Sequence, residues 1–559
     1  MTPPPATTEA RPEVVTRTGV APARTPWIER ATSADHKSVA MLYLGAAAAF
    51  GVVALVQFAL MRVQLIVPDS TIIVPETFAR LLSASGVTFA VLFCVPLVLG
   101  IASYIVPLQI GARGVAFPRL NLLSAWLYIA GGIVLYTSFA YTPGEAGVLG
   151  LPPLADTVFS PGRGVDNWIM GVGLATIGFV LWGVNMAVTV RRMRAPGMAW
   201  RRLPLFSWAA TVISYLLLAV GPVLVAALAL LTIDRQFDGV FFDAGEGGAP
   251  LLYEHLIYIY LTGIYAVVVL FAAGVISEIL PTMARKPIFS HRAVAASLVA
   301  IGALAPLAWM QNMYSAPIPE GFQYGTMAVA LALAVPLGTL FFVWIATLWR
   351  GMLRLNAALL YAAAAISALA GGLAGELAYS VIPVGWQLAN TTASQGDTLY
   401  VLAGGSVFGG FAALHYWLPK MTGRSLGEGL AKAALGLMFT GLTVYVLAMF
   451  LAGLEGQQVD VFRYPSGEGL SALNLIASLA AFGFVAGALV ELGNVAHGYS
   501  NGRPAQHDPW GGSTLEWFTL SPPPPHNFDA VPDVRSAEPM LDIREAVRRG
   551  TDGDGASLS

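Results

Sequence analysis

The chain has 559 residues, of which 56% are hydrophobic and only 11% are charged, and its formal net charge is −2 at pH 7. This composition is too apolar and too poor in charge for a soluble protein of this length. It also argues against a nucleic-acid-binding protein, because Lys and Arg do not outnumber Asp and Glu. We therefore predict an integral membrane protein.

Long apolar segments recur along almost the whole chain. Each is about 20 residues long, enough to cross a hydrocarbon core of about 30 Å, and backbone amides in lipid must be satisfied within their own segment. In chain order the segments begin near Val39, Leu81, Leu122, Trp168, Trp208, Leu256, Ala293, Thr326, Ala357, Leu399, Ala433 and Leu473. The sequence thus predicts an all-α membrane protein with about twelve transmembrane helices.

The distribution of basic residues predicts the orientation. Loops after the even-numbered segments carry most of them, for example Arg113, Arg191 and Arg285, and basic loops face the cytoplasm. We expect a multi-pass plasma-membrane protein with both termini cytoplasmic and one membrane domain at residues 27–528. The flanking residues 1–26, rich in Pro and Thr, and 529–559 are predicted to be disordered.

Four loop motifs are the most specific feature of the sequence. PLQIGARGVAFPRLN (107–121), MRAPGMAWRRLPLFSW (193–208), SEILPTMARKPIFSHR (277–292) and DPWGGSTLEWFTLSPPPPHNF (508–528) follow one another, each just beyond a predicted membrane segment. Together they resemble subunit I of the haem-copper oxidases, of the cytochrome c oxidase type, over nearly the whole chain. The resemblance implies that family's helical bundle.

The resemblance also implies a chemistry, and the sequence can be checked for the residues that this chemistry requires. The family passes electrons through a six-coordinate haem to a second haem paired with copper, where oxygen is reduced to water and protons are pumped. Six membrane-embedded histidines hold these groups, because imidazole suits both haem iron and copper.

The histidine positions carry other residues here. The family's Met-His-Gly falls on residues 84–86, its Gly-His-Pro-Glu-Val-Tyr on 261–266, its His-His pair on 311–312 and its His-Phe-His on 397–399. The six ligand positions are thus Ser85, Thr262, Gln311, Asn312, Asp397 and Leu399. We predict no bound haem or copper, whereas the family would bind two haems and one copper.

The family's proton routes are altered in the same way. The entry carboxylate of one route corresponds to Gly114 and the lysine of the other to Leu340, while the relay glutamate and the cross-linked tyrosine correspond to Ile264 and Ala266. The residues that flank the haem propionates correspond to Ala389-Asn390 and Gln457-Gln458. The supporting groups have therefore changed with the ligands.

Few other residues could hold a metal. The seven histidines lie in tails, loops or near helix ends, and His255 is expected at a helix end or interface. The single cysteine, Cys94, is expected to be a small core residue. Two acids in predicted helices, Glu376 and Asp397, are candidates for a shared polar or ion-binding role, although solvation at helix ends is the favoured interpretation.

Loss of two haems would leave voids, which are costly among packed helices. We expect the second, sixth and tenth helices to move inward, bulky residues such as Tyr258, Tyr260 and Trp309 to fill the space, or lipid to enter.

Three functions remain open. The favoured one is a catalytically inactive, subunit I-like protein that acts as a structural, assembly or interaction component beside other oxidase-type subunits in the lipid bilayer. The second is an active terminal oxidase subunit that transfers electrons from cytochrome c to oxygen with proton pumping. The third is a transporter or small-molecule binder that reuses the emptied core.

Overall fold

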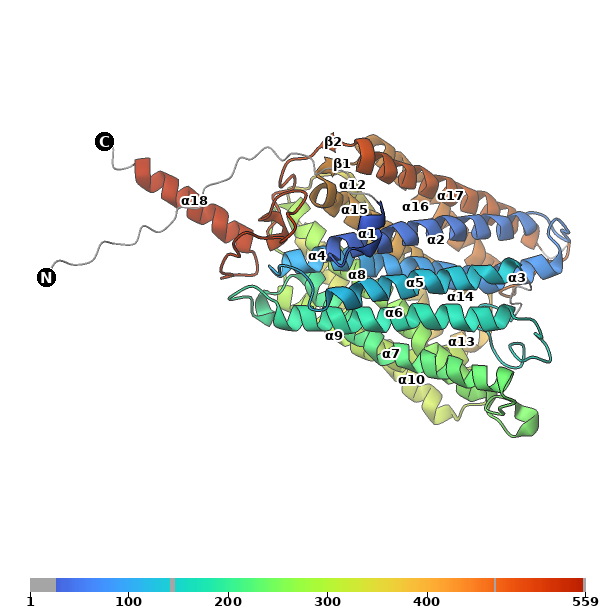
Figure 1. Ribbon diagram of the computed structural model, residues 1–559. Coiled ribbons are helices and arrows are strands. Elements are labelled where there is room, and N and C mark those ends of the chain that lie inside the picture. The colour runs from blue at the N-terminus through green and yellow to red at the C-terminus, as the bar shows by residue number, and fades with distance from the viewer. Residues whose placement is uncertain (1–26, 141–145, 467–468, 556–559) are drawn as a thin grey trace.

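The computed structural model describes residues 27–140, 146–466 and 469–555. Twelve helical segments in this part of the chain are long and apolar enough to cross a membrane, so the prediction of about twelve transmembrane helices is confirmed. Figure 1 shows them running side by side as one bundle. The predicted N-terminal extension, residues 1–26, lies outside the described residues.

Several of the twelve segments are built from more than one helical element. In chain order the segments are α2 (His36–Gln64); α3 (Pro75–Val87), η1 (Thr88–Cys94) and α4 (Val95–Gln109); α5 (Pro118–Thr137) and η2 (Ser138–Ala140); α6 (Gly164–Arg192); α7 (Leu205–Gln236); α8 (Pro250–Ala284); α9 (His291–Leu304) and η5 (Ala305–Met313); α10 (Glu320–Ala332) and α11 (Ala334–Leu348); α12 (Ala357–Tyr379); α14 (Thr392–Ala403), η6 (Gly404–Phe408) and α15 (Gly409–Thr422); α16 (Glu428–Leu454); and α17 (Leu470–Asn501).

Shorter elements precede, connect or follow these segments. They are α1 (Trp27–Thr32), η3 (Trp200–Arg202), η4 (Ala244–Glu246), α13 (Ile382–Leu388), η7 (Leu515–Trp517), α18 (Pro539–Gly555) and the antiparallel strands β1 (Arg424–Ser425) and β2 (Arg503–Pro504). Because the number of crossings is even, α1 and α18 lie toward the same end of the bundle, while α3 lies toward the opposite end (Figure 1).

Small residues allow helices to pack closely. A Cβ added to Gly171 of α6 would lie 2.7 Å from the carbonyl oxygen of Gly131 on α5, and one added to Gly178 would lie 2.6 Å from the carbonyl oxygen of Ser124. Van der Waals packing of this kind replaces the hydrophobic drive that is missing between helices in lipid. The glycines of 171–178 therefore fix the α5–α6 contact.

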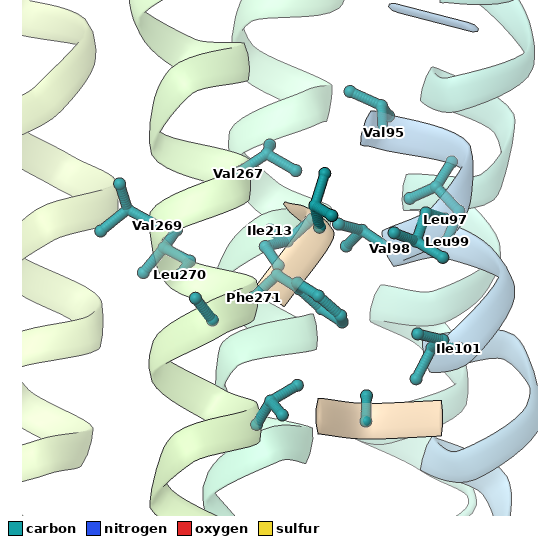
Figure 2. Close-up of a cluster of buried hydrophobic side chains, with 14 of the residues drawn as sticks. Val95, Leu97, Val98, Leu99, Ile101, Ile213, Val267, Val269, Leu270 and Phe271 are labelled. Atoms are coloured by element: carbon teal, nitrogen blue, oxygen red, sulfur yellow. The ribbon is translucent and has the colours of Figure 1, made fainter. Parts of the chain in front are cut away.

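The centre of the bundle is aliphatic. Figure 2 shows Val95, Val98 and Ile101 of α4 beside Ile213 of α7 and Phe271 of α8. These side chains are at most 1% exposed. The chain thus builds an aliphatic core between α4, α7 and α8.

The predicted disorder of residues 529–559 is wrong for most of that segment. Residues 539–555 form α18, Met540 is buried, and Arg544 forms an ion pair with Asp508 and donates a hydrogen bond to the carbonyl oxygen of Gly512 at 3.0 Å. The burial of Met540 and the contacts of Arg544 fix the start of this helix, which the composition of the segment alone did not indicate.

Candidate functional site

A long cavity of about 810 Å³ lies between α2, the α3–η1–α4 segment, the α14–η6–α15 segment, α16 and α17. Both Ser85 and Leu399 line it, and so do Gln457 and Gln458. These four residues occupy positions that, by family resemblance, would bind a haem iron or face its propionates. The structure therefore brings the predicted low-spin haem positions into one space.

The donor set of this cavity does not fit a haem. The Ser85 hydroxyl donates to the carbonyl oxygen of Leu82 at 3.0 Å, and Leu399 has a hydrocarbon side chain with no lone pair. Gln457 exchanges two hydrogen bonds with Asn474, at 2.8 and 3.4 Å. Axial ligation of haem iron needs an imidazole, thiolate, thioether or phenolate, and neither ligand position supplies one.

Two unusual helical turns form part of the cavity wall. The π-helical segments η1 and η6 contribute Phe89, Phe93 and Ser406, and the Cys94 thiol donates to the Ser406 hydroxyl at 3.2 Å across the two segments. Such wide turns are rare and concentrate at functional sites. Cys94 is fully buried, as expected, but it also joins two walls of the cavity.

Of the expected outcomes, which were inward movement of helices, filling by bulky residues or entry of lipid, inward movement has not closed this cavity. The lining includes exposed residues such as Val52, so the cavity is open at the side of the bundle and a molecule from its surroundings can enter it. Of the bulky residues expected to fill the space, Tyr260 contributes to the lining. The remaining expectation is that another molecule occupies the cavity.

One of the other ligand positions, Gln311, belongs to a polar network centred on Glu376 of α12. Its carboxyl accepts hydrogen bonds from the Thr398 hydroxyl at 3.0 Å and from the Gln311 amide at 3.3 Å. The Gln311 carbonyl in turn accepts from the Ser380 hydroxyl at 3.0 Å. The Gln311 side chain, at a position predicted to correspond to a copper ligand, is thus hydrogen-bonded by protein groups on both sides.

Asp397 lies beside this network and is only 7% exposed. Its carboxyl accepts a hydrogen bond from the Tyr379 hydroxyl at 2.6 Å, and a Cβ added to Gly375 would lie 2.1 Å from one of its oxygens. The favoured interpretation, solvation at a helix end, is wrong for Asp397. The two acids instead come together in the bundle, because α12 and α14 pack against each other.

The remaining predicted positions carry no free donor toward a shared metal. The Thr262 hydroxyl donates to the carbonyl oxygen of Tyr258 at 2.8 Å, and Asn312 is exposed. Ile264, Ala266 and Leu340 are buried aliphatic residues, at most 2% exposed. Gly114 lies in the loop between α4 and α5. Copper prefers imidazole or sulfur ligands, so this donor set does not fit it.

Histidines are found elsewhere in the bundle. His255 Nδ1 accepts a hydrogen bond from Trp309 Nε1 at 3.0 Å, which is the helix-end contact expected for it. His415 forms a buried pair with Glu491, at 2.7 Å, which the sequence did not indicate. The sequence did carry a signal for this pair, because Glu491 is an acid in the last apolar segment and a buried acid needs a partner. Within the described residues, no three His, Cys, Asp or Glu side chains gather closely enough to hold a metal.

A second buried polar cluster joins the loop motifs at the end of the bundle that carries α18. Glu516 accepts from Gln109 Nε2 and from Trp417 Nε1, both at 3.2 Å, and Lys420 Nζ donates to the carbonyl oxygen of Thr519 at 2.6 Å. Burial raises the pKa of the Glu516 carboxyl. Glu278 caps α7 by accepting from the Phe206 amide at 3.0 Å, a structural role as its motif suggested.

Comparison with known proteins identifies the family to which this architecture belongs. The family described as "Cytochrome C and Quinol oxidase polypeptide I" matches residues 38–485. A probable cytochrome c oxidase subunit 1-alpha of Streptomyces avermitilis is 37% identical over 92% of this chain and 89% of its own length. Cytochrome c oxidase subunit 1 of Bacillus subtilis is 35% identical over 92% of this chain and 83% of its own.

A solved structure of a heme-copper terminal oxidase dimer has the same fold. Its chain superposes on this one with a TM-score of 0.71 and is 14% identical in sequence. The match covers 84% of this chain and 85% of that chain. The loop motifs, the twelve-helix bundle and these matches agree. The chain is a multi-pass membrane protein that belongs to the cytochrome c and quinol oxidase polypeptide I family, the subunit I family of the haem-copper oxidases.

Proposed function

We propose that this protein is a catalytically inactive subunit I homologue that serves as a structural, assembly or interaction component of a respiratory complex in the plasma membrane. The observation that carries the proposal is the donor set. Hydroxyl, amide, carboxyl and aliphatic side chains occupy the positions of the family's six histidines, and Ser85, Thr262 and Gln311 already hydrogen-bond within the protein. No step of oxygen reduction follows from these groups.

The retained parts of the structure support a role in assembly. Buried hydrogen bonds join the loop motifs that match the family: Gln109 donates to Glu516, the Phe206 amide donates to Glu278, and Lys420 donates to the carbonyl oxygen of Thr519. Contacts of this kind hold the loops at one end of the bundle together, because buried polar groups favour the arrangement in which they are hydrogen-bonded. Other oxidase-type subunits are the partners that this end of a family member would meet.

Two other functions stay in view because single observations favour them. The names of the relatives describe oxidases, which favours a terminal oxidase subunit that passes electrons from cytochrome c to oxygen. The large cavity, together with the buried Glu376 and Asp397 carboxyls, favours a transporter or small-molecule binder. The oxidase function needs haem and copper ligands that the described residues do not supply. The transport or binding function needs no partner subunit.

Purification from the native membrane separates the three functions. We expect a colourless protein with no stoichiometric haem or copper that elutes with other oxidase-type subunits, while a haem-containing oxidase prepared in the same way serves as the positive control. Haem bands at about one or two per polypeptide would contradict the proposal and restore the oxidase function. A colourless protein that elutes alone would contradict the assembly role and favour transport or small-molecule binding.

A further inference from the structure

The cavity is long and spans most of the bundle. Its lining on α2 runs from Met41 to Arg62, about 32 Å at a rise of about 1.5 Å per residue, and on α17 it runs from Phe484 to Ser500. This length compares with the roughly 30 Å hydrocarbon core of a bilayer. A flexible chain fits a space of this shape better than a compact molecule does.

The walls are apolar and the cavity opens sideways. Leu44, Phe58 and Phe93 are among the many aliphatic and aromatic residues that line it. Two lining residues of α2 are exposed: Gly45, where an added Cβ would meet no atom within 4 Å, and Val52, which is 38% exposed. A hydrocarbon chain could therefore enter from the bilayer without passing through water.

One end of the cavity carries a buried cation. Arg62 is 4% exposed, and its Nε and Nη2 donate to Ser478 and Asn474 at 2.9 to 3.3 Å. Its Nη1, which has two N–H groups, donates to the Met449 sulfur at 3.7 Å, and the guanidinium carbon lies 5.6 Å from the centroid of the Tyr445 ring. Within the described part of the chain no carboxylate forms an ion pair with Arg62, so an oxygen of a bound molecule would complete its hydrogen bonding.

An acid lies at the same end of the lining. Asp460 is exposed and accepts a hydrogen bond from Gln395 Nε2 at 3.1 Å, and both residues line the cavity. Arg62 and Asp460 thus present opposite charges to a molecule bound there. A head group that carries a phosphate and an ammonium complements both charges, whereas a purely anionic head group would face the Asp460 carboxylate.

We propose that this cavity binds a zwitterionic glycerophospholipid from the bilayer, with one acyl chain between α2 and α17, a phosphate or ester oxygen on Arg62 and the ammonium near Asp460. The proposal rests on the proposed function in one respect, that no haem occupies the cavity. The lipid then supplies the packing that the haem would give a catalytic family member, and the cavity becomes a specific lipid site.

Native mass spectrometry on the full-length protein tests this proposal. The protein is released from nanodiscs of equal parts phosphatidylethanolamine and phosphatidylglycerol, and we expect about one retained phosphatidylethanolamine per polypeptide. The variant Gly45→Phe fills the cavity and should lower lipid retention at least tenfold. Its matched control is Gly338→Phe, since Gly338 of α11 is also exposed, has no atom within 4 Å of an added Cβ and does not line the cavity.

A second protein variant, at a residue expected to contact the lipid head group, keeps the proposal testable if Gly45→Phe does not fold. Asp460→Asn removes the acid at an exposed position, and we expect it to shift retention toward the anionic lipid by about tenfold. Equal retention of both lipids by the unmodified protein, no retained lipid, or equal retention by the Gly45 and Gly338 variants would each overturn the lipid proposal alone. A stoichiometric haem in the same spectra would instead overturn the proposed function.

Discussion

At the scale of single residues, the positions that the family resemblance assigns to haem and copper ligands fall into two groups. Ser85 and Leu399 line a cavity that has kept a ligand-sized volume, whereas Gln311 and Asp397 have become parts of internal hydrogen-bond networks. The two groups of positions therefore predict different outcomes when their side chains are changed.

Restoring imidazoles should restore haem binding only in the open cavity. We expect the double variant Ser85→His, Leu399→His to acquire about one six-coordinate haem per polypeptide, because two axial nitrogens then line the same space. Visible spectroscopy of the purified variant measures this. The single variants are the controls, and an absence of haem in the double variant would show that the cavity has lost the shape of a haem site.

Changes at Asp397 should act on stability. Asp397→Asn keeps an oxygen that accepts from Tyr379, while Asp397→Leu leaves that hydroxyl without its 2.6 Å partner. An unsatisfied buried hydroxyl costs about 1–3 kcal/mol, so we expect the leucine variant to be less stable than the asparagine variant by roughly this amount. Thermal unfolding in detergent compares them, and equal stabilities would mean that Tyr379 finds another partner.

At the scale of elements, the C-terminal segment is anchored by buried polar groups rather than by a long helix. Glu516 of η7 reaches Gln109 of α4 and Trp417 of α15, and Glu278 lies near it. The contacts join three segments that are far apart in the chain. Their strength should therefore depend on the protonation of Glu516.

Glu516 predicts a pH dependence of stability. Because burial raises the pKa of Glu516 in the folded protein, the folded state favours the protonated acid. Its stabilising effect is therefore greatest below the unfolded pKa, about 4.3, and is lost as pH rises from there through the raised folded pKa.

The variant Glu516→Gln keeps an acceptor for Gln109 and Trp417 but cannot titrate. We expect its melting temperature to fall less with rising pH over this window than that of the unmodified protein. Melting curves at several pH values measure the difference, and Glu545→Gln in the exposed part of α18 is the matched control. Parallel pH profiles for the Glu516 variant and the unmodified protein would exclude Glu516 as the titrating group.

At the scale of the whole molecule, the bundle contains a large and mostly apolar cavity that is open at its side. Its stability should depend on what occupies that space. A ligand that binds only the folded state stabilises it by about 2.7 kcal/mol at a hundred times its Kd.

Removal of lipid should therefore destabilise the purified protein. We expect delipidation to lower the melting temperature by several degrees and readdition of phosphatidylethanolamine vesicles to restore it, with phosphatidylglycerol vesicles less effective. The Gly45→Phe variant should show a smaller change on delipidation, since its side chain occupies part of the cavity. A melting temperature that is insensitive to lipid would mean that the cavity collapses at little cost.

The sequence predicted much of the fold and only part of the candidate site. All twelve membrane segments were predicted, because a run of about 20 apolar residues is a local property. The pairing of His415 with Glu491 was not, since the two residues are 76 positions apart and come from α15 and α17. The helix α18 was missed because its start depends on contacts with Asp508 and Ser513.

By itself the sequence determined that the chain has about twelve segments able to cross a membrane, and it predicted which side chains occupy the family's ligand positions, because both follow from residue identity in order. Only the tertiary structure decided that Ser85 and Leu399 line one cavity while Glu376 and Asp397 meet in another place. Which helices pack together, and how closely, depends on side chains distant in the chain, and this packing determines whether a space stays open for a bound molecule.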